Sequence, residues 1–342
     1  MRLLVTGGAG YVGSNFIHYV LDKYSDWEII NLDKLTYAGN LESLKDIEGE
    51  RRHHFVKGDI GNSDLVNGLL SQGVDLIVNF AAETHVDRSI IDPAPFVETN
   101  VKGTQVLLEE AKRHNIKKFI HISTPEVYGG SSPLRGDEKF VEQSPFLPNN
   151  PYSASKAAAD LMCRAYNQTY GLPVMLTRFA NAYGPYQYPE KLVPLVITNA
   201  LGDKPIPIYG DGQHRRNWIY IEDICRAIDL IIQKGRSGEA YNIGSGYEMS
   251  NLELVGKILD ILQKPHELIT FVPERPAHDW QYPLDSTKIK KEVGWELTSD
   301  FETALRETIR WYTENESWWK KLQVLDYTRF YQEISESKEL FK

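Results

Sequence analysis

The sequence predicts an α/β fold, a doubly wound parallel sheet with a smaller C-terminal lobe. Short apolar runs that are typical of buried parallel strands, such as residues 2–6 and 119–122, alternate with helical patterns through the first 180 residues. Beyond that point the alternation loosens, and residues 181–217 contain five prolines. A chain of 342 residues has room for about two domains of ordinary size.

Composition restricts the class of protein. A hydrophobic content of 42% and a charged content of 25% are typical of a soluble globular protein. No apolar run approaches the roughly 20 residues that span a membrane, and a strand that begins at Arg2 leaves no room for a cleavable signal. Cys163 and Cys225 fall in helical patterns, where buried reduced thiols indicate a cytoplasmic protein. A net charge of −9 argues against nucleic acid as a partner.

The first turn of the chain is rich in glycine. Gly7, Gly10 and Gly13 are spaced three apart between a strand and a helical pattern. This spacing lets the backbone approach a pyrophosphate at a helix N-terminus. The next strand ends at Asp33, 20 residues beyond Gly13. A carboxylate at that place accepts hydrogen bonds from the adenosine ribose, which favours NAD over NADP. The pattern therefore predicts a Rossmann-type sheet that binds NAD.

Further residues are expected along the same cofactor. Asp59 and Ile60 follow a strand and are placed to flank an adenine, and the small residues Ala81 and Ala82 suit close approach to the middle of the cofactor. The remaining expected contacts lie in the glycine loop and just after Asp33. They are Tyr11, Val12, Lys34 and Thr36.

Several segments together resemble one family. They are the glycine loop, the pair Tyr152 and Lys156, and residues 33–40, 83–89, 183–192, 216–218 and 275–279. Over roughly residues 1–322 the chain is similar to the extended short-chain dehydrogenase/reductases. Within these it resembles the nucleotide-sugar 4,6-dehydratases of the dTDP-glucose 4,6-dehydratase type.

The resemblance implies a domain organisation and partners. Residues 1–180 form the NAD-binding domain, with 218–245 returning to it. Residues 181–322 form an interleaved nucleotide-sugar lobe, and 323–342 a C-terminal tail. The expected substrate is a UDP- or dTDP-linked hexose, and the expected assembly is a homodimer through helices around 97–113 and 153–169.

Tyr152 is the candidate base for a secondary sugar hydroxyl, which loses hydride to NAD only if its proton leaves as well. A phenol with a pKa of about 10 is too weak a base at neutral pH unless a cation favours phenolate. Lys156 lies one helical turn away and can supply that charge and bind the nicotinamide ribose. Thr124 can hydrogen-bond the same sugar oxygen. The alternative, an ordinary surface Tyr and Lys, is disfavoured by the glycine loop.

Once C4 is a ketone, the C5 proton becomes acidic, and Glu126 is the candidate that removes or returns it. This role rests on the resemblance, because a Glu after a strand is otherwise solvated or ion-paired. Arg216 and Arg275 suit a diphosphate, with surface salt bridging as the alternative. The resemblance also implies substrate contacts, and no metal site is expected. The substrate contacts are Thr84, His85, Asn181, Glu190, Lys191, Leu192 and His278.

One departure from the family lies between Thr124 and Glu126. The family's dehydratases have Asp there, understood to protonate the C6 hydroxyl as water leaves. Pro125 has neither a side-chain donor nor a backbone N–H. Losing a general acid slows a reaction about 10²–10⁴-fold. Smaller departures are Ala182, Ala277, Trp280 and Gln281.

Four hypotheses follow from this departure. The protein is a 4,6-dehydratase in which Glu126 or a water serves as the acid, or it receives a substrate that is already dehydrated as a 5,6-ene. In the second case C4 is oxidised, C6 is reduced and Glu126 protonates C5. The third hypothesis is a C4 or C5 epimerase. The fourth, a catalytically inactive nucleotide-sugar sensor, is disfavoured because Tyr152 and Lys156 are intact.

Overall fold

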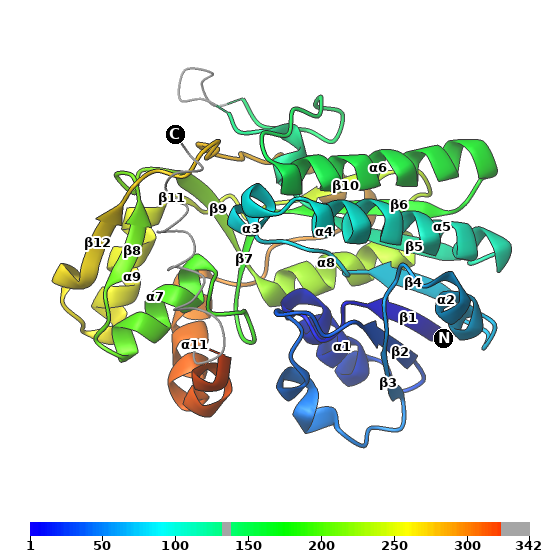
Figure 1. Cartoon of the computed structure of the whole chain (residues 1–342), viewed down its shortest axis with the longest axis horizontal. Coiled ribbons are helices and arrows are strands. Elements are labelled where there is room, and N and C mark those ends of the chain that lie inside the picture. Colours follow the sequence, from blue (N-terminus) through cyan, green and yellow to red (C-terminus); the bar gives the residue numbers. More distant parts are fainter. Residues whose placement is uncertain (132–137, 323–342) are drawn as a thin grey trace.

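The centre of the protein is one parallel sheet. In the computed structural model of the chain, residues 1–131 and 138–322 are described. Seven strands pair in the order β10-β6-β5-β4-β1-β2-β3, so that the chain winds outward from β1 in one direction and from β4 in the other (Figure 1). This is a doubly wound Rossmann-type sheet, and the predicted fold class is confirmed. The strands are β1 (Arg2–Thr6), β2 (Glu28–Asp33), β3 (His53–Lys57), β4 (Leu76–Asn79), β5 (Lys118–Ser123), β6 (Val174–Phe179) and β10 (Ala240–Ile243).

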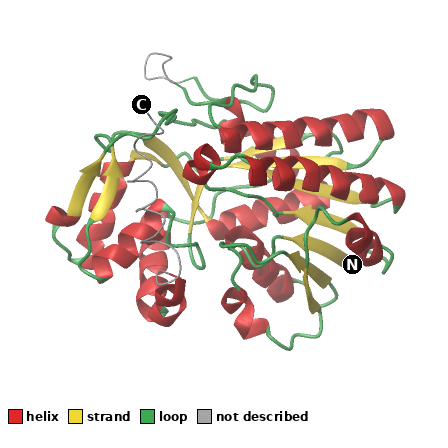
Figure 2. Cartoon of the chain, in the orientation of Figure 1, coloured by secondary structure: helices red, strands yellow, loops and turns green. Residues whose placement is uncertain are grey.

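Helices cover both faces of this sheet (Figure 2). Successive strand residues point to opposite faces, so Leu3 and Val5 pack under α1 and α8 while Leu4 packs under α2, α5 and α6. Cys163 of α6 and Cys225 of α8 are buried, one in each of these two cores. The helices are α1 (Tyr11–Lys23), α2 (Ser63–Leu70), α5 (Thr104–Arg113), α6 (Pro151–Tyr170) and α8 (Ile221–Lys234).

The smaller lobe lies at one end of the sheet and has a core of its own (Figure 1). A three-stranded sheet in the order β11-β9-β7 and a two-stranded sheet of β12 and β8 pack with three helices around Trp218, Trp318 and Trp319. The strands are β7 (Asn181–Tyr183), β8 (Ile206–Tyr209), β9 (Arg215–Tyr220), β11 (Glu248–Ser250) and β12 (Ile269–Val272). The helices are α7 (Leu192–Leu201), α9 (Asn251–Leu262) and α11 (Phe301–Glu314).

The segment 218–245, expected to return to the main sheet, does so only from Ile221 onward. Trp218 to Tyr220 belong to β9 of the smaller sheet, because their backbone pairs with β7, while the preceding residues of β9 pair with β11. The chain then crosses the main sheet as α8 and joins its edge as β10. The expected tail, 323–342, lies outside the described residues.

Short elements complete the part of the chain that the structure describes. The helix expected around residues 97–113 is not uniform, because a π-helical segment precedes α5. None of the helices formed by the described residues combines the length and the apolar character that a membrane crossing needs. The short elements are η1 (Leu41–Ile47), α3 (Val86–Ile91), α4 (Ala94–Phe96), η2 (Val97–Gly103), η3 (Pro125–Tyr128), η5 (His266–Leu268) and α10 (Thr287–Val293).

Candidate active site

A cavity of about 350 Å³ lies at the carboxyl ends of the central strands, between the sheet and the lobe. Its wall takes residues that follow β1, β2, β4, β5 and β6, together with lobe residues around α7 and β9. Ligands of open α/β sheets collect at this edge, next to the point where the strand order reverses. All the residues predicted to bind the cofactor line this cavity, as do all four predicted catalytic residues.

The glycine loop is packed too tightly for a side chain at Gly7 or Gly13. A Cβ on Gly13 would lie 2.3 Å from the Gly7 carbonyl oxygen, and one on Gly7 would lie 2.6 Å from the Ala81 nitrogen. Gly7 also adopts a φ of +69°, which favours glycine. The bare backbone leads into α1, whose N-terminal N–H groups face a phosphate in folds of this kind. The loop therefore fits a dinucleotide pyrophosphate.

Gly13→Ala is expected to weaken NAD binding by at least about tenfold, because the new methyl group has to displace the loop backbone. Isothermal titration calorimetry with NAD measures the effect. Gly68→Ala is the matched control, since a Cβ on Gly68 of α2 meets nothing within 4 Å. Equal NAD affinity in both variants would contradict the assignment of the loop.

Asp33 ties the loop to the end of β2. Its Oδ2 accepts from the Ala9 N–H at 2.9 Å and its Oδ1 from the Leu35 N–H at 2.7 Å. Burial raises the pKa of the carboxyl, and these two hydrogen bonds oppose the shift. Each carboxylate oxygen keeps a further lone pair for a ribose hydroxyl. Beside it, the Lys34 ammonium pairs with Asp59 at 2.7 Å.

Tyr152 and Lys156 enter the cavity from the first turns of α6. A capping box between Asn150 and Ser153, with a proline in the first turn, fixes the start of this helix. Lys156 is buried, its Nζ donates to the Ile122 carbonyl at 2.6 Å, and burial lowers its pKa to about 8. The side chain is therefore mostly an ammonium at neutral pH.

The pKa of Tyr152 is raised rather than lowered. Burial is the main cause, the charges of Glu126 and Asp160 add to it, and a hydrogen bond with Thr124 opposes them. The lowering expected from Lys156 is not among the effects that set this pKa. A ligand that brings positive charge close to Tyr152 would lower the pKa of its phenol.

Pro125 and Glu126 form the start of the turn η3, directly after β5. Thr124 caps the turn through its Oγ1, which accepts from the Glu126 N–H at 3.3 Å. Proline suits the first position of such a turn because its φ is already fixed there. Both residues line the cavity. Burial raises the pKa of the Glu126 carboxyl, and the charge of Arg275 opposes the shift.

The predicted substrate residues divide into two groups. Thr84, Asn181, Glu190, Lys191 and Leu192 line the cavity. Glu190 accepts from the Tyr37 hydroxyl at 3.1 Å, and burial raises its pKa to about 7. Lys191 crosses to the loop after β4, where its Nζ donates to the Thr84 carbonyl at 3.2 Å.

The second group does not line the cavity. His85 caps α3, with its Nε2 3.7 Å from Glu190. The Arg216 Nη2 lies 3.1 Å from the His278 Nε2, and Arg275 pairs with Asp87 at 3.6 Å. The charges of Arg275 and Arg216 nevertheless reach Glu126, where they oppose the rise in pKa that burial causes. The two arginines therefore place positive charge behind the residues that line the cavity.

His214, Glu274 and His278 place three potential metal ligands close together. The two imidazole rings, however, stack with centroids 3.8 Å apart and planes only 14° from parallel. A metal ion binds in the plane of each imidazole, and two nearly parallel stacked planes do not meet at one ion. The His278 Nε2 also accepts from Arg216. The group therefore does not fit a shared cation as it stands.

Two residues near the site were not found from the sequence. Tyr282 lines the cavity, and its hydroxyl donates to Asp279 at 2.5 Å. Asn100 is buried in the π-helical η2, where its side chain bonds both backbone groups of Glu83 and the hydroxyl of Ser155. π-helical turns often occur at functional sites. Neither residue belongs to a motif with recognisable spacing, so no sequence signal marks it.

Comparison with known proteins names the family. Residues 4–308 match the model of the GDP-mannose 4,6 dehydratase family. The chain belongs to this family. A dTDP-glucose 4,6-dehydratase of Streptomyces niveus is 49% identical over 330 residues, which are 95% of this chain and 97% of that protein. The predicted resemblance is therefore confirmed.

Solved structures agree with the family. DesIV, a dTDP-glucose 4,6-dehydratase of Streptomyces venezuelae with NAD and TYD bound, is 48% identical with a TM-score of 0.90, covering 94% of this chain and 100% of its own. A UDP-glucuronic acid 4-epimerase of Bacillus cereus, in complex with UDP-glucuronic acid and NAD, is 29% identical with a TM-score of 0.85. The match covers 92% of this chain and 99% of the epimerase chain. The epimerase is thus the more distant of the two.

Proposed function

We propose that this protein is an NAD-dependent enzyme of the nucleotide-sugar 4,6-dehydratase family that accepts a UDP- or dTDP-linked hexose already dehydrated to a 5,6-ene. The product is the corresponding 4-keto-6-deoxy sugar. The observation that carries the finer assignment is Pro125, which lines the cavity between Thr124 and Glu126 and offers no proton donor.

The cofactor is NAD, as predicted, and the glycine loop with Asp33 would hold it. When bound, it would supply the hydride chemistry, oxidation at C4 and reduction at C6. Tyr152 takes the proton of the C4 hydroxyl, Thr124 orients that oxygen, and Lys156 holds positive charge beside it. The NAD bound in a relative that is 48% identical supports this assignment.

The second half of the reaction requires an acid at C5 and no leaving group. Glu126 suits this step, because a raised pKa keeps its carboxyl protonated to higher pH than an ordinary glutamate. The C4–H and O4–H bonds and the C5=C6 double bond are lost. A C4=O double bond, a C6–H bond and a C5–H bond replace them. The substrate and the product therefore have the same mass, and no water is released.

True 4,6-dehydration is the second candidate, and the identity of 49% to a dTDP-glucose 4,6-dehydratase favours it. In that reaction Glu126 begins as a carboxylate that removes the C5 proton, and a separate acid protonates the departing C6 hydroxyl. Pro125 cannot be that acid. The raised pKa of Glu126 also works against its use as a base.

Purified protein incubated with 5,6-ene UDP- or dTDP-hexoses is expected to convert them without a change in mass, while the parent 6-hydroxy sugars react at least about 10²-fold more slowly. Mass spectrometry with proton NMR of C6 distinguishes the two reactions. Fast loss of one water from a 6-hydroxy sugar would instead establish the dehydratase. Inertness toward both substrates would contradict both candidates.

The expected homodimer and cytoplasmic location stay predictions. The helices proposed to meet a second copy, η2 with α5 and α6, carry the exposed apolar side chains Val97 and Leu161. Size-exclusion chromatography with light scattering measures the assembly.

A further inference from the structure

Buried polar side chains continue inward from Lys156. Its Nζ lies 3.5 Å from the Nε2 of His121 in β5, and that nitrogen lies 3.8 Å from the Oδ1 of Asp160 in α6. The Asp160 Oδ2 accepts from the Arg178 Nε of β6 at 2.9 Å, and the Arg178 Nη1 donates to the Tyr128 hydroxyl at 2.6 Å. All five side chains are buried. They form a continuous row from the cavity wall into the protein.

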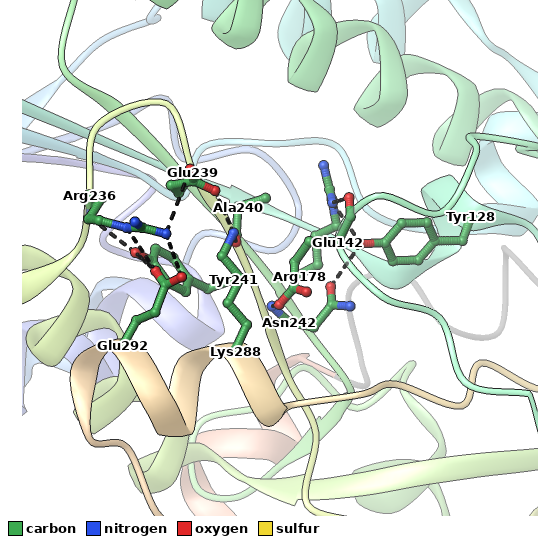
Figure 3. A network of polar contacts seen from close by, with 10 residues as sticks. All are labelled: Tyr128, Glu142, Arg178, Arg236, Glu239, Ala240, Tyr241, Asn242, Lys288 and Glu292. Carbon is green, nitrogen blue, oxygen red and sulfur yellow. Dashed lines mark hydrogen bonds and ion pairs between the residues drawn. The ribbon is translucent and has the colours of Figure 1, made fainter.

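The far end of this row is held by a second set of contacts. Figure 3 shows Arg178 beside Tyr128, whose hydroxyl donates to the Asn242 Oδ1 at 2.9 Å. The backbone N–H of Asn242 in turn donates to Glu142. Arg178 therefore has partners of its own on the side away from Lys156, and its place does not depend on Lys156.

The hydrogen bonds around His121 indicate which ring nitrogen carries the proton. The Thr6 Oγ1 donates to the Asn79 Oδ1 at 2.6 Å. With the amide in this orientation the Asn79 Nδ2 donates to the His121 Nδ1 at 3.2 Å, which places the ring proton on Nε2. Burial, followed by the charge of Lys156, holds the pKa of His121 well below its usual range. The ring is therefore neutral.

Asp160 is then the anion nearest to this part of the row. It follows Lys156 by four residues on α6 and so lies on the same face of the helix. Its Oδ1 has no hydrogen-bond partner among the described residues, although a buried oxygen normally has one. Burial lowers the pKa of Lys156, and the charge of Asp160 opposes this. The other groups near Lys156 are Cys163 on its own helix, neutral His121, and Tyr152 one turn earlier, whose own pKa the Asp160 charge raises.

We propose that Asp160 is a positioning residue, whose carboxylate acts across the His121 ring to keep Lys156 in its ammonium form beside Tyr152. Arg178 prevents this carboxylate from pairing directly with Lys156, so that the Lys156 amine stays on the Ile122 carbonyl at the cavity wall. The inference rests on the proposed function only in taking Tyr152 and Lys156 as the groups that oxidise C4.

The test measures the pKa of Lys156 without a substrate. Trace acylation with acetic anhydride over a pH series, followed by peptide mass spectrometry, reports the neutral fraction of each lysine. Asp160→Asn is expected to lower the pKa of Lys156 by on the order of one unit, so that its acylation below that pKa rises about tenfold. Asp160→Glu keeps the charge and is expected to restore the value of the unmodified protein.

Asp229→Asn is the matched control. Asp229 is equally buried, lies on α8 against the opposite face of the sheet, and accepts from Lys23 and Tyr24. Its replacement is expected to destabilise the fold without moving the pKa of Lys156. If Asp160→Asn does not fold, the double variant Asp160→Asn with Arg178→Met removes the buried ion pair as a unit. Because the Asp160 charge outweighs that of Arg178 at Lys156, the pKa of Lys156 is expected to fall in this variant as well, by a smaller amount. An unchanged pKa of Lys156 in Asp160→Asn, or in the double variant where the single one does not fold, would overturn the proposal.

A second readout links the charge to catalysis. Since a lower pKa means that the ammonium is lost at lower pH, the alkaline limb of the C4 oxidation rate should move to lower pH in Asp160→Asn. A residue with a merely structural role would lower the rate equally at all pH values, and that result would contradict the proposal. Failure of the 5,6-ene assignment would leave both readouts intact, because C4 oxidation is common to all the enzymatic candidates.

Discussion

Glu126→Gln is expected to leave C4 oxidation intact and to slow formation of the 4-keto-6-deoxy product about 10²–10⁴-fold. Glutamine has almost the same shape but no transferable proton, and the carboxyl is assigned only to C5. The sugar should therefore stop as the 4-keto-5,6-ene, which has lost two hydrogens relative to the substrate. Rapid quench followed by mass spectrometry detects this species, and it should build up in the amount of the enzyme.

The control for this variant is Glu142→Gln. Burial raises the pKa of Glu142 as it does that of Glu126, but Glu142 belongs to the network of Figure 3 and does not line the cavity. An amide oxygen can still accept from the Asn242 N–H, so product formation should stay within about twofold. If Glu126→Gln formed product at the normal rate, the acid at C5 would have to be another group.

The pH dependence separates the two roles of Glu126 by sign. As an acid, the carboxyl must be protonated, so the rate of C5 protonation should fall as pH rises through its pKa. As the base of a dehydratase, it must be ionised, and the rate should fall as pH decreases through the same pKa. Because burial raises this pKa, the acid form survives further toward neutral pH than in a free glutamate.

The fold and the cofactor end of the site are predictable because their signals are local. Gly7, Gly10 and Gly13 recur at a fixed spacing, and two of them, Gly7 and Gly13, lie where the backbone leaves no space for a Cβ. Asp33 follows after one helix and one strand. Tyr152 and Lys156 are one helical turn apart, so sequence spacing alone places them on one face. Site residues that lie on one loop or one helix can therefore be recognised from their spacing in the sequence.

The features of the fold and the site that the sequence does not predict depend on packing between segments that are distant in the chain. The partners of β9, which are β7 and β11, have only three residues each and lie far from it in the chain, so Trp218 to Tyr220 carry no sign of which sheet they enter. The pKa of Tyr152 is set by burial and by Glu126, which belongs to another element. Asp160 meets His121 and Arg178 only once α6 lies across β5 and β6. Such contacts have no period or spacing in the sequence.

Pro125→Asp is expected to increase 4,6-dehydration of a 6-hydroxy nucleotide sugar by about 10²–10⁴-fold, the range over which a general acid acts. The introduced carboxyl would stand next to that of Glu126 at the cavity wall. Two carboxyls that share one site do not both ionise easily, so one of them keeps a proton. The pair would then contain an acid for the C6 hydroxyl and a base for the C5 proton. The loss of one water in the product mass measures the gain.

Pro125→Asn is the matched control, because asparagine frees the backbone N–H and fills the same space without supplying an acid. Both variants lose the rigidity of proline in the first position of η3, worth about 0.4–1 kcal/mol. If dehydration rises in Pro125→Asp and not in Pro125→Asn, the gain is due to the proton that the carboxyl supplies. An equal gain in both would instead assign the effect to the freed turn. No gain in either would mean that Ala182, Trp280 or Gln281, rather than the acid, separates this site from a dehydratase.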